Sequence, residues 1–571
     1  MFRRYFIWKI FVLVNLWLIK ISIRENKISE CDFVNTFHKY QPLKNKTPVI
    51  YWVVSGVITG LFVYIRLRLL SLPLESDEGE YAYAGQLILK GIPPYKEIYS
   101  MKFPGVYYFY SFFLILFGDS SNAIRIGSLI VNLCSAFFIL KIGELLHNRI
   151  TGIFAAIGFI ALSAAPRFHG LMANTEHFVN LFVIAAAFCF LLWLKKRKTI
   201  LLFLSGVLSG FACIMKQHGA YFLLVIIVAL IIEQITNRQL IFKSIKKHLL
   251  VLSGFTLIIL SLFFLVWVNG TYQKFIFFTI EYGRSYISYK TFGEEFFNFF
   301  FFLAGRIVNN HIMWLLIICG VFSSFKTMGR NISLLIHCWF MISIAAIFPG
   351  YYFRPHYYLL MIPVAAIYFG IFFNSLFEWS NQSKNLKRHI APILFSACLL
   401  YYLIGERQVF FSLNPNDAAA NMYFGNHIFS EAVTIGNYIN KHSKPTDKIL
   451  VVGSEPEIYF YAQRKSSTGY IYDFPLVENH PLKDSMVNEF RNEILQHFPT
   501  FVINTKSHWY DEWFHGWVLN NVLNVNSEYD LKGFCIRNET GDGIFLWINN
   551  DSNFAKDKIL WEIYKKKEIK I

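Results

Sequence analysis

The sequence predicts a polytopic all-α membrane domain followed by a smaller α/β domain. Hydrophobic residues make up 55% of the 571 residues and charged residues only 16%, whereas soluble domains carry roughly a quarter charged residues. Long apolar segments recur between short cationic loops, as in proteins that cross a bilayer several times. From about Gly405 the composition becomes polar and the apolar runs become short. These observations exclude a soluble single-domain protein and a disordered chain.

Five basic segments orient the predicted membrane domain. They are KNK at 44–46, KKRK at 195–198, KSIKKH at 243–248, KTMGR at 326–330 and KNLKRH at 384–389. Because cytoplasmic loops are enriched in Lys and Arg, we expect all five segments on the cytoplasmic side. The net charge of +17 is explained in this way. No nucleic-acid partner is therefore expected, since such a partner would require a basic face on a soluble domain.

With these loops inside, we expect about eleven spans, each of about 20 mainly apolar residues, and a C-terminus outside. The expected spans are Thr47–Leu69, Ile124–Leu146, Thr151–Pro166, His177–Leu194, Thr199–Lys216, Gly219–Thr236, Leu249–Asn269, Ile307–Phe325, Asn331–Pro349, Tyr357–Phe377 and Ile390–Ile404. Long outer loops are expected at 70–123 and at 270–298.

Two further apolar segments are not counted as spans. Gly105–Phe117 would cover only about 20 Å as a helix, and a span there would place KKRK outside. We expect it to lie in the outer interface, with a short tilted span as the alternative. Tyr5–Ile23 is interrupted by Lys9 and Lys20 and lacks a cleavage site, so we expect a cytoplasmic interfacial helix. A twelfth span is the alternative there.

The chain is thus divided into an interfacial segment (1–46), a transmembrane domain (47–404) and an extracytoplasmic α/β domain (405–571). In the last of these, helical periodicity at Ile428–Ile439 and Met486–Phe498 precedes the short apolar runs Ile449–Val452 and Phe501–Ile503. Helix followed by strand, repeated, is typical of an α/β domain. We expect a multi-pass protein of the cell membrane.

No metal or nucleotide motif is found. No two of the eight cysteines have metal-ligand spacing. The sequence also lacks a phosphate-binding loop of the G-x-x-x-x-G-K-[ST] kind, a dinucleotide fingerprint and HExxH. A cytosolic nucleotide donor is therefore not expected. No cofactor is required, although the sequence leaves a divalent metal open.

The first outer loop carries the densest group of candidate residues. Asp77 and Glu78 precede a predicted interfacial helix over Glu80–Leu89. A carboxylate at that position can act as a base, or Asp77 can cap the helix in a capping box with Glu80. Lys102, in MKFPG, can neutralise a lipid phosphate or be a lysine that extends to the interface.

Three later segments add candidates on the same predicted face. Glu176 follows Asn174 in the loop RFHGLMANTEHF (167–178), so it is either a second reactive carboxylate or part of a helix cap. Lys216 and His218 lie in a turn between spans, where polar residues are costly and often functional. Arg354 and His356 precede the tenth span as phosphate ligands or interfacial anchors. Carboxylates and cations on one face suit a reaction on a lipid phosphate.

These segments resemble a known family. DEGEYAYAGQLILKGIPPY, MKFPG and LFGDSSNAIR are similar to the first outer loop of type C (GT-C) glycosyltransferases. The similar branch contains the bacterial protein O-mannosyltransferases and the aminoarabinose-lipid A transferases. ANTEHF, MKQ and RPHYYLLMIP match later segments, so the resemblance covers about Thr47–Pro363. In the C-terminal domain only the arrangement is similar, with ILVVGSEPEIYFYAQR as its most similar stretch.

The resemblance implies transfer of a sugar from a polyprenyl-phosphate donor to an acceptor on the extracytoplasmic face, with inversion. It implies that Asp77 is the catalytic carboxylate and that Lys102 binds the donor phosphate. It places Glu176 near a second acidic position, where other members often have Asp, and Arg354 and His356 at a late polar position. The sugar and the acceptor (protein, lipid or polysaccharide) stay open.

The chemistry agrees with this assignment. Inversion requires a base on the face opposite the leaving group, and the departing phosphate requires cations, for which Lys102, Arg354 and Lys216 are candidates. The alternative function is a multi-pass transporter or lipid flippase with an outer domain. Transporters often carry ionisable residues near the midplane of two repeated halves. No repeat is found here, and the charges collect at one predicted surface.

Overall fold

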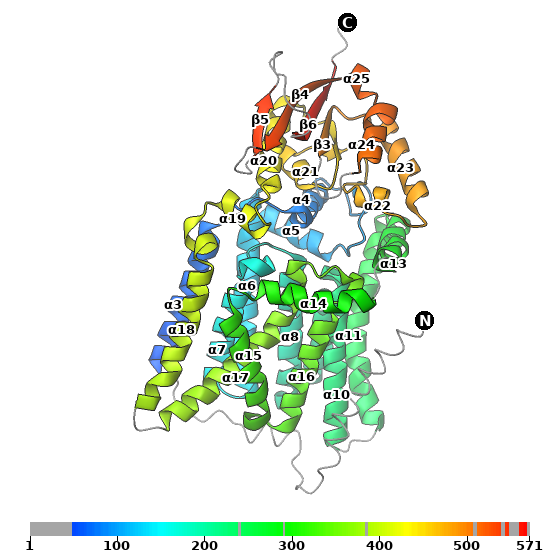
Figure 1. The fold of residues 1–571 in the computed structure, drawn as a ribbon. Helices are drawn as coiled ribbons and strands as arrows, with labels where there is room; N and C mark the ends of the chain where they lie inside the picture. Colours follow the sequence, from blue (N-terminus) through cyan, green and yellow to red (C-terminus); the bar gives the residue numbers. More distant parts are fainter. Residues whose placement is uncertain are drawn as a thin grey trace.

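The computed structural model describes residues 48–237, 241–288, 292–382, 386–505, 511–537, 543–547 and 559–567. The predicted interfacial segment 1–46, with its helix at Tyr5–Ile23 and the KNK loop, lies outside the described residues. Figure 1 shows two layers, a bundle of long helices and, at one end of it, a sheet flanked by short helices. Two helices of the first outer loop lie between these layers.

Each of the eleven predicted spans coincides with a helix. These helices are α3 (Val49–Arg68), α6 (Ser121–Leu146), α7 (Arg149–Leu162), α8 (Thr175–Lys196), α9 (Thr199–Met215), α10 (Leu223–Thr236), α11 (Ile241–Val268), α15 (His311–Thr327), α16 (Arg330–Ala345), α17 (Ile362–Asn381) and α18 (Ile390–Gly405). The apolar periodicity therefore located the helices of the bundle correctly.

Length and composition support fewer membrane crossings than the predicted number. Among the described residues, 6 helices are long and apolar enough to span a bilayer, or 7 if one bent pair counts as a single span. The 6 are Val49–Arg68, Ser121–Leu146, Thr175–Lys196, Gln217–Thr236, Ser244–Val268 and Pro355–Asn381. The apolar helices α7, α9, α16 and α18 are shorter, 14 to 17 residues. The count of eleven thus stays a prediction.

The second outer loop contains a helix that the sequence reading placed in a loop. After α12 (Tyr272–Ile276) and α13 (Gly283–Ser288), helix α14 (Phe292–Arg306) crosses the end of the bundle (Figure 1). It makes an angle of 119° with α15. Phe297 and Phe301 are exposed, whereas Phe299 is buried. Helix α14 therefore presents one apolar face away from the protein and packs with the other.

Basic residues gather at the end of the bundle away from the sheet. Glu233, near the end of α10, contacts Arg197 at 2.8 Å and Lys247 at 2.6 Å, which joins the ends of α8, α10 and α11. Lys326 lies in the last turn of α15, and Arg330 begins α16. This polarity agrees with the loop charges. That the basic end faces the cytoplasm stays a prediction.

The C-terminal region forms a sheet of six strands in the order β2-β1-β3-β6-β4-β5. The strands are β1 (Lys448–Val452), β2 (Lys465–Ser466), β3 (Phe501–Thr505), β4 (Tyr529–Arg537), β5 (Gly543–Trp547) and β6 (Ile559–Lys566). β1 pairs in parallel with β2 and β3, and the remaining pairs are antiparallel. The predicted strands at Ile449–Val452 and Phe501–Ile503 are therefore confirmed as β1 and β3.

Short helices surround this sheet. They are α19 (Pro415–Met422), α20 (Ile428–His442), α21 (Glu457–Ala462), α22 (Phe474–Val477), α23 (Lys483–Gln496), α24 (Glu512–Trp517) and α25 (Val525–Glu528). One buried hydrophobic cluster continues from Ile139 of α6 in the bundle to Ile435 and Ile449 of the C-terminal region. The two layers are thus packed together, and the division at residue 405 stays a prediction.

Helix α4 (Ser76–Leu89) begins four residues before the predicted Glu80 and packs against α5 (Gly105–Phe117). Its residues from Glu78 to Leu87 are all buried, whereas an interfacial helix would keep an exposed face. The expectation for this helix is corrected, because α21 covers it. At Gly79 a Cβ atom would lie 2.5 Å from the backbone nitrogen of Glu457, so only glycine allows this close approach. The interfacial placement of α5 stays a prediction.

Candidate active site

The start of α4 determines which of its carboxylates face the site. Glu75 is the N-cap and accepts a hydrogen bond from the backbone N–H of Glu78, and the Glu78 side chain accepts one from the N–H of Glu75. The predicted capping box of Asp77 with Glu80 is therefore wrong, because the helix begins two residues earlier than that pairing requires. This leaves Asp77 and Glu80 available for contacts with other elements.

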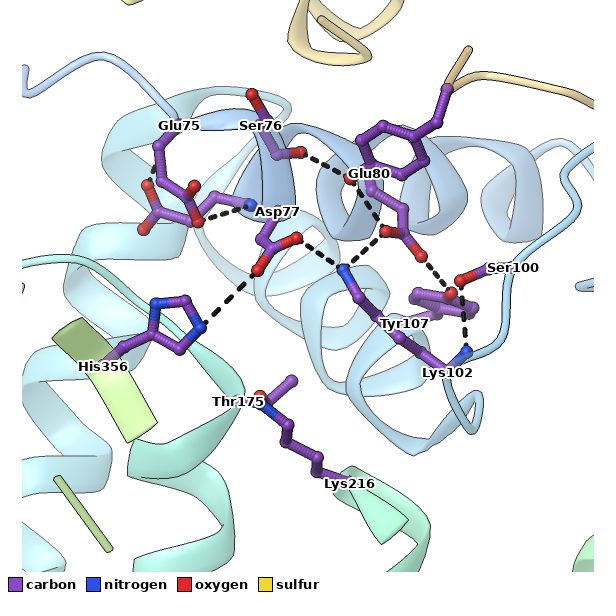
Figure 2. A network of polar contacts seen from close by, with 12 residues as sticks. Glu75, Ser76, Asp77, Glu80, Ser100, Lys102, Tyr107, Thr175, Lys216 and His356 are labelled. Atoms are coloured by element: carbon purple, nitrogen blue, oxygen red, sulfur yellow. Dashed lines mark hydrogen bonds and ion pairs between the residues drawn. The ribbon is translucent and has the colours of Figure 1, made fainter. Parts of the chain in front are cut away.

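Lys102 connects Asp77 with Glu80 (Figure 2). Its Nζ lies 2.6 Å from Asp77 Oδ1 and 2.7 Å from Glu80 Oε2. The Asp77 side chain is 30% exposed and Glu80 is fully buried. One ammonium is thus shared by an accessible carboxylate and a buried one. The predicted proximity of Asp77 and Lys102 is present in the structure.

Glu80 and Tyr472 are contacts of this site that sequence reasoning missed. Tyr107 donates a hydrogen bond to Glu80 Oε1, and Tyr472 of the C-terminal region lies 2.9 Å from Glu80 Oε2. The sequence reading assigned Glu80 to a helix cap. Glu80 lies three residues after Asp77, and residues three apart share a face of a helix. That spacing could have identified Glu80 as a neighbour of Asp77 from the sequence. No motif marks Tyr472.

Lys216 and Glu176 form a second ammonium–carboxylate pair, in the same part of the structure as His356. His356 Nε2 is 3.7 Å from Asp77 Oδ2. Lys216 Nζ is 2.5 Å from Glu176 Oε1, and Thr175 donates to the other oxygen of Glu176. Figure 2 shows Lys216 and Thr175 in one view with His356 and Asp77. The structure thus brings the first outer loop, the start of α8 and the turn after α9 together.

The loop at 167–178 differs from the surface loop that the sequence suggested. Glu176 and His169 are both buried. His169 lies against the ring of Tyr423, with ring centres 4.2 Å apart, and its Nε2 is 3.2 Å from the carbonyl oxygen of Met422. The C-terminal region contacts this loop, and its polar residues His169, Asn174, Glu176 and His177 are buried, whereas Arg167 is exposed.

His218 and Arg354 lie at the margin of the site. The ring of His218 meets that of Tyr357 edge-on at 5.5 Å, and Lys216 Nζ lies 3.9 Å above the same ring. Arg354 is exposed, and its guanidinium lies 5.7 Å from the ring centre of Tyr352. Arg354 is thus accessible to a ligand at the rim. His218 instead contacts the ring of Tyr357, which also contacts Lys216.

Glu78 has the contacts of a structural residue. Both of its carboxylate oxygens accept hydrogen bonds from Arg125 of α6, one of them at 2.8 Å, and the N–H of Ala173 also donates to it. The side chains of Glu78 and Arg125 are 0% and 4% exposed. These contacts fix the start of α4 to α6 and to the loop before α8.

Burial and neighbouring charges shift the pKa values of Glu75 and Asp77 in opposite directions. Burial opposes ionisation of Asp77, but Lys102, together with the nearby His356 and Lys216, outweighs it and holds the pKa of Asp77 well below its usual range. Burial, with the nearby charges of Asp77 and Glu78, raises the pKa of Glu75 well above its usual range. The pKa values of the two neighbouring carboxyl groups are thus shifted in opposite directions. Within the described residues, no group of three or more His, Cys, Asp or Glu side chains is arranged to hold a metal.

Comparisons with known proteins agree with the sequence resemblance. Residues 101–267 match the family described as dolichyl-phosphate-mannose-protein mannosyltransferase. This segment contains Lys102, Glu176 and Lys216 but not Asp77 or Arg354. No curated protein matches the chain.

Two solved structures share the fold at low sequence identity. ArnT from Cupriavidus metallidurans, bound to undecaprenyl phosphate, is 16% identical, with a TM-score of 0.56 over 88% of this chain and 98% of ArnT. The oligosaccharyltransferase AglB from Archaeoglobus fulgidus, in complex with an inhibitory peptide and a dolichol-phosphate, is 12% identical. Its TM-score is 0.54 over 88% of this chain and 75% of AglB. The chain thus has the fold of the GT-C membrane glycosyltransferases and is similar, in residues 101–267, to the protein mannosyltransferase family.

Proposed function

We propose that the protein is a membrane glycosyltransferase that transfers a sugar from a polyprenyl-phosphate donor to an acceptor on the extracytoplasmic face. The observation that carries this proposal is the direct contact of Asp77 with Lys102 at the end of the bundle opposite the basic loops. A base and a phosphate-binding cation are the two groups that such a transfer requires. The bound lipid phosphates of ArnT and AglB support this donor class.

Each group has a role in the proposed reaction. The bond between the anomeric carbon and the phosphate oxygen breaks, and the lipid phosphate leaves with an additional negative charge. Lys102 stabilises that charge, assisted by Lys216 and by Arg354 at the rim. Asp77 accepts the proton of the acceptor hydroxyl, which attacks the opposite face of the sugar and inverts the anomeric carbon.

Donor binding would also activate the base. In the free protein Lys102 keeps the pKa of Asp77 low, and a carboxylate with a low pKa is a weak base. A phosphate that binds Lys102 takes over part of the interaction with its ammonium. Because the opposite charge near Asp77 is then compensated, the pKa of Asp77 rises toward the operating pH. We infer that Asp77 becomes an effective base only when the donor is bound.

Sidedness follows from the same proposal. The sheet and the Asp77–Lys102 pair would lie outside the cytoplasm, and the chain would be a multi-pass protein of the cell membrane. The acceptor is a protein, a lipid or a polysaccharide.

The deciding experiment measures bond cleavage. Purified protein is incubated with a panel of radiolabelled polyprenyl-phosphate sugars and candidate acceptors, and free polyprenyl phosphate and labelled product are quantified. The proposal predicts release of the lipid phosphate together with a labelled acceptor. A transporter or flippase would instead move the labelled lipid across a proteoliposome with its sugar bond intact. Labelling of single cysteines placed in the 70–123 loop must report the outer side.

A further inference from the structure

We propose that Tyr472, in the C-terminal region, is a positioning residue of the active site that controls Lys102 through Glu80. This inference rests on the proposed function and deepens it, because it gives the C-terminal region a part in donor binding. Tyr472 lies 392 residues from Glu80 along the chain. It precedes α22 in the segment that faces α4.

The contacts of Tyr472 lead directly to the shared ammonium. Its hydroxyl lies 2.9 Å from Glu80 Oε2 and 3.1 Å from the carbonyl oxygen of Ser76, both acceptors. Glu80 Oε2 is also the atom that Lys102 Nζ approaches at 2.7 Å. Tyr472 and Lys102 therefore share the same oxygen of Glu80, while Tyr107 donates to the other one.

The burial of Glu80 makes this sharing important. Glu80 is fully buried, and a buried carboxylate depends on its hydrogen-bond donors for stabilisation. If the Tyr472 hydroxyl is removed, Lys102 becomes the remaining donor to Oε2 and is held more strongly by Glu80. Its ammonium is then less available to Asp77 and to a donor phosphate. The Tyr472 hydroxyl thus weakens the hold of Glu80 on Lys102 and leaves the ammonium more available to Asp77 and to a donor phosphate.

The sheet holds Tyr472 in position through the next residue. Asp473 accepts a hydrogen bond from the Ser454 hydroxyl, and its Oδ2 lies 3.1 Å from His515 Nε2. His515 Nδ1 lies 2.7 Å from Asn504 Oδ1 on β3. Asp473, His515 and Asn504 are all buried. This chain of contacts anchors the Tyr472 backbone to the core of the sheet.

Helix α4 is fixed to the same region, so the distance between Tyr472 and Glu80 is set by packing on both sides. The hydroxyl oxygen of Tyr83 accepts a hydrogen bond from the N–H of Ser466 at 2.8 Å. Gln86 Nε2 donates to the carbonyl oxygen of Phe460 at 3.3 Å. The C-terminal region therefore holds both the helix that carries Glu80 and the residue that hydrogen-bonds to it.

The test compares Tyr472→Phe with Tyr470→Phe. The Tyr470 hydroxyl donates to Glu489 on α23 at 2.8 Å, so its removal is a matched loss within the same region. Binding of undecaprenyl phosphate to the purified full-length protein is measured without any acceptor. We expect Tyr472→Phe to weaken this binding about tenfold, equivalent to about 1.4 kcal/mol, and Tyr470→Phe to leave it unchanged. In turnover, the donor KM should rise while the acceptor KM stays constant.

A double-mutant cycle tests the route through Glu80. In a Glu80→Gln background, Tyr472→Phe should have almost no further effect on undecaprenyl phosphate binding. An equal loss in both backgrounds would overturn the inference, and so would unchanged binding by a folded Tyr472→Phe protein. If the wild type itself binds no undecaprenyl phosphate, the proposed function fails, and the inference fails with it.

Discussion

Replacement of Asp77 by Asn separates catalysis from folding. The substitution keeps the shape of the side chain but removes the negative charge that would accept the acceptor proton. General base catalysis contributes typically about 10²–10⁴-fold to a rate, so we expect kcat to fall by that factor. The helix start is unaffected, because Glu75 and Glu78 form the cap of α4.

The structure also gives the expected change in stability. Asp77 is 30% exposed, and Lys102 keeps its contact with Glu80 at 2.7 Å when Asp77 is neutral. Loss of a partly exposed ion pair costs about 0–1 kcal/mol. Glu78→Gln is the matched control, because it leaves Arg125 buried without its counter-charge and should cost about 3–5 kcal/mol.

Two assays on the purified variants distinguish these effects. Release of polyprenyl phosphate from the labelled donor gives the rate, and thermal unfolding gives the stability. We expect Asp77→Asn to lose about 10²–10⁴-fold in rate while staying nearly as stable as the wild type, and Glu78→Gln to be clearly destabilised. A folded Asp77→Asn protein with a rate within about tenfold of the wild type would refute the assignment of Asp77 as the base.

Three further predictions concern other contacts. Lys102→Met should lower kcat about 10²–10³-fold, the usual effect of removing one group that stabilises developing charge, as measured by phosphate release. Gly79→Ala should destabilise the protein by about 1–3 kcal/mol in thermal unfolding, because its Cβ would lie 2.5 Å from the backbone of α21, whereas Gly60→Ala meets open space. Burial raises the pKa of Glu478 to about 7, above the ordinary value of about 4.3. Its contribution to stability is therefore complete below about pH 4.3 and lost as the pH rises from there through 7. In Glu478→Gln, the unfolding temperature should not show this decrease with rising pH.

Much of the fold could be predicted from apolar periodicity. Every expected span is a helix, and the strands at Ile449–Val452 and Phe501–Ile503 are present. Helix α14 was missed because a run of phenylalanines does not show where a chain bends, and the bend to α15 is 119°. The number of membrane crossings is less well determined, because several of the helices are short.

The site was predicted in part. Asp77 and Lys102 are in contact as expected, and His356, for which no such contact was predicted, lies 3.7 Å from Asp77; the roles of all three stay a prediction. The cap was placed wrongly because Glu75 and Glu78 have the same spacing as Asp77 and Glu80, and only the tertiary contact of Glu78 with Arg125 decides between them. The small residues from Gly79 to Gly85 were a signal that α4 is closely packed rather than interfacial. The contact of Tyr472 with Glu80 depends on packing between distant segments, which a single sequence does not reveal.

The most direct test of the central claim is the release of polyprenyl phosphate from a polyprenyl-phosphate sugar by purified protein in the presence of an acceptor. We expect the wild type to release the lipid phosphate and label the acceptor, and Asp77→Asn and Lys102→Met to do both at least about 100-fold more slowly. Equal release by the wild type and both variants, or no release by the wild type with any donor of the panel, would contradict the claim.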